Sequence, residues 1–271
     1  TQRAAVVVLG SATLLTLTAL VFIIVFVLQK GLPVLSWTFL TGSPQDMGRA
    51  GGIFPAIAGS VALTVLSVLL AAPLGVGTAV YLTEYTRESR LTAVIRFGAD
   101  CLAGIPSIIF GLFGFILFVT ILKMGWSLLA GGLTLALMIL PTIIRTTEEA
   151  IKAVPLSSRE VSYSLGATRW QTVYKVILPN ALPGILTGVM LGVGRSLGET
   201  AAVIFTAGSS LRMPVSIFDS VRTMAVHFYL LAREGISAEN AYGTAAALII
   251  AVLSVNLLAY WMMNRMVAKR T

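Results

Sequence analysis

The sequence has few of the side chains on which soluble enzymes rely. Only 11% of its 271 residues are charged against 57% that are hydrophobic, which excludes an ordinary soluble globular domain. The single cysteine, Cys101, excludes an internal disulfide and a cysteine-rich metal site. The single histidine, His227, leaves histidine-based metal chemistry or Ser/His/Asp hydrolysis dependent on one residue with no nearby partner in sequence. These absences predict a protein with no catalytic residues, no metal site and no cofactor.

Two further absences limit the partners. No Gly-x-x-x-x-Gly-Lys-Ser/Thr segment occurs, so the chain has no such loop of its own to hold nucleotide phosphates. The net charge of +8 would suggest nucleic acid in a soluble protein, but no basic run alternates with aromatic residues. The basic residues stand instead at the ends of apolar segments, which predicts a role in membrane orientation and no nucleic-acid partner.

Long apolar stretches predict an all-α polytopic membrane protein with one transmembrane domain over residues 1–271. A helix needs about 20 apolar residues to cross a bilayer core of about 30 Å, and six segments satisfy this or come close. These predicted spans are 4–28, 55–82, 91–122, 127–144, 183–206 and 242–266. The first is interpreted as a span and not as a signal peptide, because no small-residue cleavage signature follows it. In the third, GIPSIIFGLFG at 104–114 fits either a packed or a broken helix.

The basic residues also predict an orientation. With six spans, both termini share one side. Twelve of the 19 lysines and arginines lie on that side, six lie on the other and Arg195 lies inside a span. The positive-inside rule therefore places both termini and the long polar loop, 145–180, in the cytoplasm.

The polar loop is predicted to be a helix–glycine–helix hairpin. Ser157 with Glu160, and Thr168 with Gln171, each fit a capping box that begins a helix. Gly166 between them suits the left-handed residue that ends the first helix. Apolar side chains recur on the loop at helical spacing, namely Val161, Leu165, Trp170, Val173, Tyr174 and Ile177. This apolar surface either packs against the chain's own helix ends or docks a cytoplasmic partner.

The loop resembles the EAA loop of the membrane subunits of ABC importers, which has Glu-Ala-Ala, three residues, Gly, nine residues, Ile, one residue and Leu-Pro. Glu160, Gly166 and Leu178-Pro179 keep the register, whereas Val161, Ser162 and Val176 depart from the pattern. In that family the hairpin inserts into a cleft of a separate ATPase subunit. The resemblance implies an ATPase-coupling surface made of Glu160, Leu165, Gly166, Ala167, Trp170, Leu178 and Pro179.

Three further segments resemble one particular group of ABC importer permeases. GIPSIIFGLFG at 104–114, PTIIRTTEEAIKAVP at 141–155 and GRSLGET at 194–200 together look like the phosphate-specific ABC importer permease, and more like its PstA than its PstC subunit. This resemblance implies a type I, MetI-like six-helix permease in the bacterial cell membrane. It also implies a second, PstC-like permease subunit, two ATP-binding subunits and an extracytoplasmic phosphate-binding protein as partners.

The predicted fifth span carries charge. If Pro183 is its first residue, Arg195 lies about 18 Å along it, near the bilayer midplane, where a charge costs roughly 2.5–3.5 kcal/mol. Glu199, one helical turn on, is the expected partner. The pair either fixes helix packing or forms an anion site, with Arg195 offering forked donors to a tetrahedral oxyanion. We favour the anion site and include Thr200 of the same segment in the path.

Arg145, at the end of the predicted fourth span, supports two interpretations. It either snorkels to the membrane boundary or lines the path, as the family resemblance implies. On the fifth span, Gly184, Gly188 and Gly192 repeat every four residues, a pattern that lets another helix approach closely.

The sequence thus predicts a permease subunit of an ATP-driven importer for inorganic phosphate, and there are three alternatives. A permease for another oxyanion, such as sulfate or molybdate, fits the same residues. An intramembrane enzyme using Glu199 lacks a second carboxylate in the spans other than Asp100. A passive anion channel would leave the hairpin unexplained.

Overall fold

The computed structural model describes residues 2–87 and 89–268, and nearly all of its regular structure is helical. Among these residues five helices are long and apolar enough to cross a membrane, and a bent helix pair is a candidate for a sixth span. The predicted all-α membrane fold is confirmed. The described strands are β1 (Pro44–Gln45) and β2 (Ala50–Gly51), which pair antiparallel. They lie in the connection between the first two long helices, together with the short helices η1 (Leu32–Val34), α2 (Trp37–Thr41) and η2 (Asp46–Gly48).

The remaining elements follow in chain order. They are α1 (Gln2–Gly31), α3 (Phe54–Val80), η3 (Tyr81–Tyr85), α4 (Arg90–Ala103), α5 (Ser107–Gly114), η4 (Phe115–Ile121), α6 (Leu128–Lys152), α7 (Leu156–Ser164), α8 (Arg169–Thr172), η5 (Val173–Ile177), α9 (Leu178–Gly198), α10 (Ala201–Thr206), α11 (Met224–Arg233) and α12 (Ala238–Ala268). The elements η3, η4 and η5 are π-helical turns that continue α3, α5 and α8.

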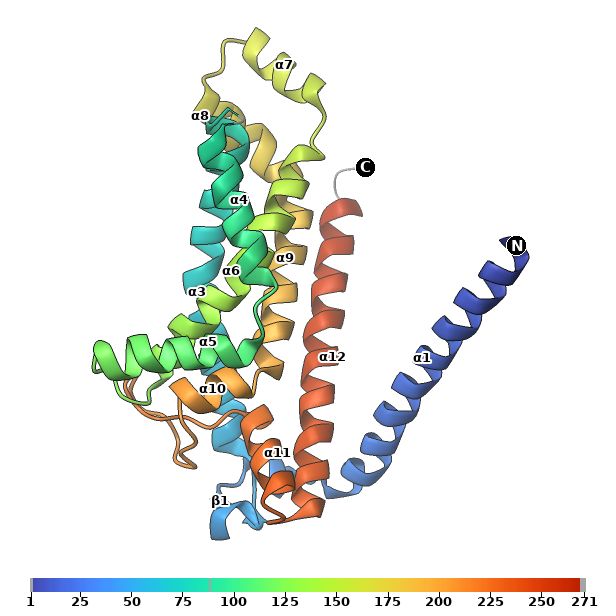
Figure 1. Cartoon of the computed structure of the whole chain (residues 1–271), viewed down its shortest axis with the longest axis vertical. Coiled ribbons are helices and arrows are strands. Elements are labelled where there is room, and N and C mark those ends of the chain that lie inside the picture. Colours follow the sequence, from blue (N-terminus) through green and yellow to red (C-terminus); the bar gives the residue numbers. More distant parts are fainter. Residues whose placement is uncertain (1, 88, 269–271) are drawn as a thin grey trace.

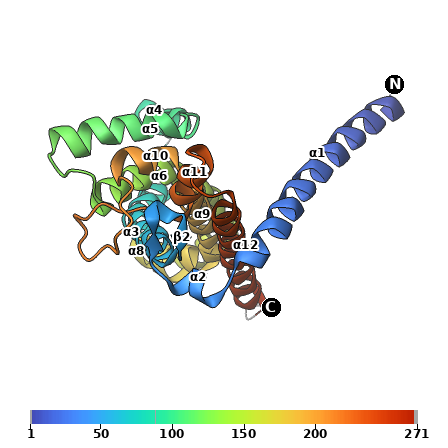
Figure 2. The ribbon, with the colours of Figure 1, turned by 90° about the horizontal axis from the view of Figure 1, so that it is seen from below.

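Helix α6 lies at the centre of the molecule. Its apolar side chains, including Leu135, Ile139 and Ile143, are fully buried against α3, α5 and α10. Helices α3, α6 and α9 run side by side, and α12 lies along α9 (Figure 1). In contrast, α1 leaves the bundle at an angle and meets the rest of the chain near its last residue, where Gly31 lies against Tyr242 of α12 (Figures 1 and 2).

Two of the predicted spans are divided. In the range 91–122, α4 and α5 meet at an angle of 103°, so of the two open interpretations the broken helix is the correct one. Pro106 lies at the bend, and proline both lacks an N–H group and disfavours helix in the residue before it. In the range 183–206, α9 ends at Gly198 and α10 begins at Ala201, with Glu199 in extended backbone between them.

The start of α9 also differs from the prediction. α8, η5 and α9 form one continuous helix from Arg169 to Gly198. Pro183 therefore lies inside this helix and is not its first residue. At the other side of the polar loop, α6 continues to Lys152, eight residues beyond the predicted end of the fourth span at residue 144.

The polar loop forms the predicted hairpin at one end of the molecule, which we call the hairpin end (Figure 1). The Thr168–Gln171 capping box is confirmed: Gln171 N donates to Thr168 Oγ1 at 3.3 Å, and Thr168 N donates to Gln171 Oε1 at 2.8 Å. Gly166 has the predicted positive φ, +79°. The Ser157 capping box is wrong, because α7 begins at Leu156 directly after Pro155 and has no side-chain cap.

Candidate functional site

The two broken spans meet at their breaks. Glu199, between α9 and α10, interacts with the side chain of Ser107, the first residue of α5, and with the backbone of Ala202. Gly111 of α5 lies so close to α10 that a Cβ atom on it would be 2.9 Å from the Cα atom of Ala202. A carboxylate is stabilised at helix N-termini by their unsatisfied N–H groups, and Glu199 lies at the start of α10 and near the start of α5.

Arg195 lies in the last turn of α9, beside this junction, and is half-buried. It interacts electrostatically with Glu199, but the two form no ion pair within 4 Å in the described chain. The prediction of a partner one helical turn on is therefore wrong in its geometry, because the helix ends before Glu199. The guanidinium keeps its forked donors for another acceptor.

Thr200 follows Glu199 in the break between α9 and α10 and is half-buried. It lines a cavity of about 520 Å³ between α5, α10 and α11, together with Tyr229 and Arg233. Arg233 donates from Nη1 to the hydroxyl of Tyr229 at 2.6 Å and lies over its ring. The cavity thus reaches the break at Thr200.

The glycine repeat of α9 lets it approach α6 closely. Each glycine lies against α6: Gly184 against Ala150, Gly188 against Thr146, and Gly192 against Ile139 and Ile143. These pairs confirm a close approach, and its partner is a helix of the same chain. They also give the antiparallel register, from which Arg145 lies about 10 Å nearer the hairpin end than Arg195 at 1.5 Å per residue. The two arginines therefore belong to different levels of the bundle.

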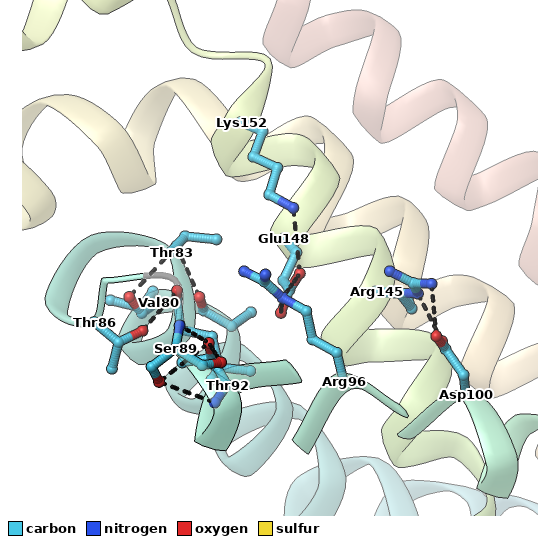
Figure 3. Close-up of polar contacts among 12 residues, drawn as sticks. Val80, Thr83, Thr86, Ser89, Thr92, Arg96, Asp100, Arg145, Glu148 and Lys152 are labelled. Atoms are coloured by element: carbon cyan, nitrogen blue, oxygen red, sulfur yellow. Dashed lines mark hydrogen bonds and ion pairs between the residues drawn. The ribbon is translucent and has the colours of Figure 1, made fainter. Parts of the chain in front are cut away.

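Arg145 is held by Asp100 of α4 (Figure 3). Its Nη2 donates to Asp100 Oδ2 at 2.9 Å, and its Nε lies 2.9 Å from Asp100 Oδ1, a bidentate pair. Both side chains are about half exposed, 48% and 46%. The sequence interpretation placed Arg145 at a helix end and left it without a partner, whereas it lies within α6 and is paired.

A second charged group lies next to this pair and was missed in the sequence. Glu148 is 1% exposed, with Arg96 Nε at 3.3 Å and Lys152 Nζ at 3.5 Å from its carboxylate (Figure 3). The spacing held a signal, since Arg96 and Asp100 lie one turn apart on α4, as do Glu148 and Lys152 on α6. Both helices carry charges of opposite sign one turn apart, and this spacing would have indicated that α4 packs on α6.

The hairpin divides its apolar surface between two uses. Val173 and Ile177 are buried against the chain's own helix ends, in a cluster with Ile151 and Val154. Leu165 is 83% exposed and Trp170 is 64% exposed. The other residues of the predicted coupling surface accompany them: Glu160 and Gly166 are exposed, and Ala167, Leu178 and Pro179 are half-buried. Packing against the chain's own helix ends is thus confirmed for Val173 and Ile177. Docking of a cytoplasmic partner stays a prediction for the exposed part of the surface.

Comparison with known proteins identifies the class. Residues 71–271 match the family described as "Binding-protein-dependent transport system inner membrane component", and the chain belongs to this family. It is therefore a multi-pass membrane permease subunit of an ABC importer and performs no catalysis. Membership also implies an ATPase and a binding protein as partners.

Particular relatives span nearly the whole chain. The probable ABC transporter permease protein YqgI of Bacillus subtilis is 33% identical over 100% of this chain and 98% of that protein. The phosphate transport system permease protein PstA of Mycobacterium leprae is 36% identical over 90% of this chain and 82% of that protein. PstA of Pasteurella multocida is 34% identical over 89% of this chain and 86% of that protein.

Solved structures agree on the fold. A chain of the MetNI methionine ABC transporter in an inward-facing conformation superposes with a TM-score of 0.65 at 20% identity, covering 78% of this chain and 94% of that one. A chain of a bacterial alginate ABC transporter superposes with a TM-score of 0.67 at 17% identity, covering 95% and 94%. The fold is that of a type I ABC importer permease.

Proposed function

We propose that this chain is the PstA-like permease subunit of an ATP-driven importer for inorganic phosphate. The observation that carries the proposal is the half-buried Arg195 beside the Glu199 break, with no ion pair within 4 Å in the described chain. Charged groups within a membrane domain are costly and usually mark a pathway. The identity of about 35% to proteins named as PstA subunits supports phosphate as the substrate.

The chemistry of the break suits a protonated oxyanion. The Arg195 guanidinium offers two parallel N–H donors to a tetrahedral anion. Glu199 is an acceptor, and phosphate retains a proton near neutral pH that it can donate to a carboxylate. Sulfate has no such proton, so the same carboxylate would repel it. Thr200 adds a hydroxyl donor on the side of the open cavity.

Arg145 provides a second station, about 10 Å nearer the hairpin end. In this conformation its donors are taken by the Asp100 carboxylate, whose two oxygens bind in the way that two phosphate oxygens would. The half-exposed position of the pair leaves it accessible for exchange. An anion that leaves Arg195 would thus replace Asp100 before its release.

The hairpin serves as the docking element for the ATPase subunits. Leu165 and Trp170 provide the exposed apolar surface of this element, and Glu160 provides an exposed negative charge. The excess of basic residues on this side supports a cytoplasmic position of the hairpin and both termini in a bacterial cell. The exposed apolar faces of α1 suit lipid and a second, PstC-like permease subunit, with two ATPase subunits and a phosphate-binding protein completing the complex.

Uptake by the reconstituted complex tests the substrate. Vesicles that contain all the subunits, loaded with ATP on the hairpin side and supplied with the binding protein outside, should accumulate labelled phosphate and exclude sulfate and molybdate. Uptake of sulfate or molybdate in place of phosphate would identify another oxyanion permease. Phosphate flux that persists without ATP would identify a passive channel.

A further inference from the structure

Arg159 connects the hairpin to two transmembrane helices. It lies in α7, and its Nη1 donates to the carbonyl oxygen of Val154 at 2.6 Å, just beyond the end of α6. Its Nη2 donates to the carbonyl of Ile151 in α6 at 2.9 Å and to Glu84 Oε1 at 3.0 Å. One side chain thus binds the end of α6 and the extension of α3.

The Arg159–Glu84 ion pair is largely buried. The two side chains are 13% and 9% exposed, far less than the Arg145–Asp100 pair. A pair withdrawn from water is screened little by salt, and the loss of one partner leaves an uncompensated charge. The connection is therefore stiff, whereas an exposed pair at the same place would separate easily.

Glu84 lies within a π-helical turn. The last turn of the α3 extension, η3, closes with a bond from Thr86 N to the Tyr81 carbonyl oxygen at 3.1 Å, a spacing of five residues. A π turn widens the helix and rotates the residues that follow it, and such turns are frequent at functional sites. The position of Glu84 thus depends on the local winding of this helix end.

A further polar connection of α7 stays within the hairpin. Ser162 and Thr172 share a hydrogen bond of 2.9 Å between their buried hydroxyls, which joins α7 to α8. Beyond α8, Val173 and Ile177 pack against Ile151. A displacement of α7 can therefore reach α8 through the Ser162–Thr172 hydrogen bond. It can also reach α3 and α6 directly through Arg159.

We propose that Arg159 and Glu84 are positioning residues that transmit the displacement of α7 to α3 and α6 during the transport cycle. The inference rests on the proposed docking role of the hairpin. Helices α3 and α6 pack against each other along their length and against α9, which carries Arg195. A movement of α7 imposed by the ATPase would thus reach the helices around the break through two buried charges.

The test uses the complete complex and four variants: Arg159→Gln, Arg159→Lys, Glu84→Gln and the exchange Arg159→Glu with Glu84→Arg. Arg169→Gln is the matched control, since Arg169 is an exposed cation at the start of α8 in the same hairpin. Two quantities are measured for each: the ATPase subunit retained per permease on purification, and the ratio of ATP hydrolysis with and without the loaded binding protein.

We expect Arg159→Gln and Glu84→Gln to retain the ATPase while the stimulation ratio falls by about tenfold, within the range of coupling between sites. Arg159→Lys keeps one charge and should recover part of the ratio. The exchange variant should recover more than either neutral variant, and Arg169→Gln should match the wild type. A purely structural role predicts loss of subunits in proportion to loss of stability, with no recovery of the ratio.

Two results would overturn the inference. One is an unchanged stimulation ratio in Arg159→Gln and Glu84→Gln complexes that hold their ATPase. The other is loss of the ATPase from every Arg159 and Glu84 variant, the Lys variant included, which would make the pair a structural connection alone. Failure of the phosphate proposal is separate, because the stimulation ratio can be measured whatever anion the binding protein carries.

Discussion

The hairpin end and the Arg195 break use charge in opposite ways. At the hairpin end, Glu148 is enclosed by two cations, and Arg159 has three acceptors within 3.0 Å. At the break, Arg195 and Glu199 interact electrostatically but form no ion pair within 4 Å in the described chain. The charges at the hairpin end are thus paired within the chain itself. Charges left incompletely paired in a costly environment are available to a ligand.

The largest expected effect comes from Arg195→Ala. A hydrogen bond to a charged group is worth about 1.5–3 kcal/mol, so losing the fork should lower phosphate uptake by about a hundredfold or more. Arg195→Lys should recover uptake in part, because it restores the charge without the planar fork. Uptake and complex yield are measured together, and the yield should stay normal because no described ion pair is lost.

A double substitution makes the comparison sharper. If Arg195 and Glu199 are merely a structural pair, removing both should be tolerated better than removing either, because neither charge is then left alone. If they bind the anion, Arg195→Ala with Glu199→Ala should transport no better than Arg195→Ala. Near-normal phosphate uptake by the double variant would exclude Arg195 and Glu199 from transport. The two charges would then be a structural pair, like those at the hairpin end.

Glu148→Ala tests the opposite side of the comparison. Removing a buried carboxylate leaves Arg96 without this partner in a poorly solvated site, which costs about 3–5 kcal/mol in comparable cases. Thermal unfolding of the purified complex should shift down clearly. Asp46→Asn is the control, because its contact with Arg49 is 3.9 Å long and exposed, and such pairs contribute at most about 1 kcal/mol. Equal shifts for the two variants would contradict the difference in burial.

Gly166→Val tests the hairpin turn. A side chain in left-handed backbone costs roughly 1–2 kcal/mol, so the turn should distort and the ATPase should be retained less well, while membrane insertion continues. Gly235→Val imposes similar strain at φ +63°, outside the hairpin, and should retain the ATPase normally. Unchanged retention and transport in Gly166→Val would exclude the hairpin from coupling.

The smallest effect concerns His227 in α11, outside the candidate spans. Burial, together with the nearby Arg222, lowers the pKa of His227 from 6.5 to about 4. As the pH falls, His227 therefore binds a proton in the unfolded chain before it does so in the folded chain. Stability should be full above pH 6.5 and fall as the pH drops toward 4, by at most about 1.4 kcal/mol per pH unit. In His227→Gln, unfolding curves recorded over this range should lose that slope, and a slope that persists would assign it to other groups.

Local patterns in the sequence predicted local structure well. The Thr168–Gln171 cap and the left-handed Gly166 depend on a few neighbouring residues, and both are confirmed. The Ser157 cap failed for an equally local reason, since Pro155 begins the helix earlier. The apolar runs predicted the spans because a bilayer demands length and hydrophobicity, whatever the tertiary contacts.

The charged contacts could not be predicted in the same way. The Arg145–Asp100 and Arg159–Glu84 pairs join residues 45 and 75 positions apart, and their partners depend on how helices pack. The end of α9 before Glu199 was missed because GRSLGET reads as continuous helix by composition. In the structure α9 ends at Gly198, and Glu199 contacts Ser107 of α5, a segment nearly 100 residues earlier.

The position of α1 has a consequence for biogenesis. Apart from its own continuation into η1, α1 makes its main contacts with α12, which lies far behind it in the chain, through Gly31 against Tyr242 and Ala246. Chains are synthesised from the N-terminus, so α1 enters the bilayer without its eventual neighbour. During that interval it is supported by lipid alone, which its uninterrupted apolar surface allows. Truncation of α12 should therefore leave α1 inserted but laterally detached, a state exposed to membrane proteases.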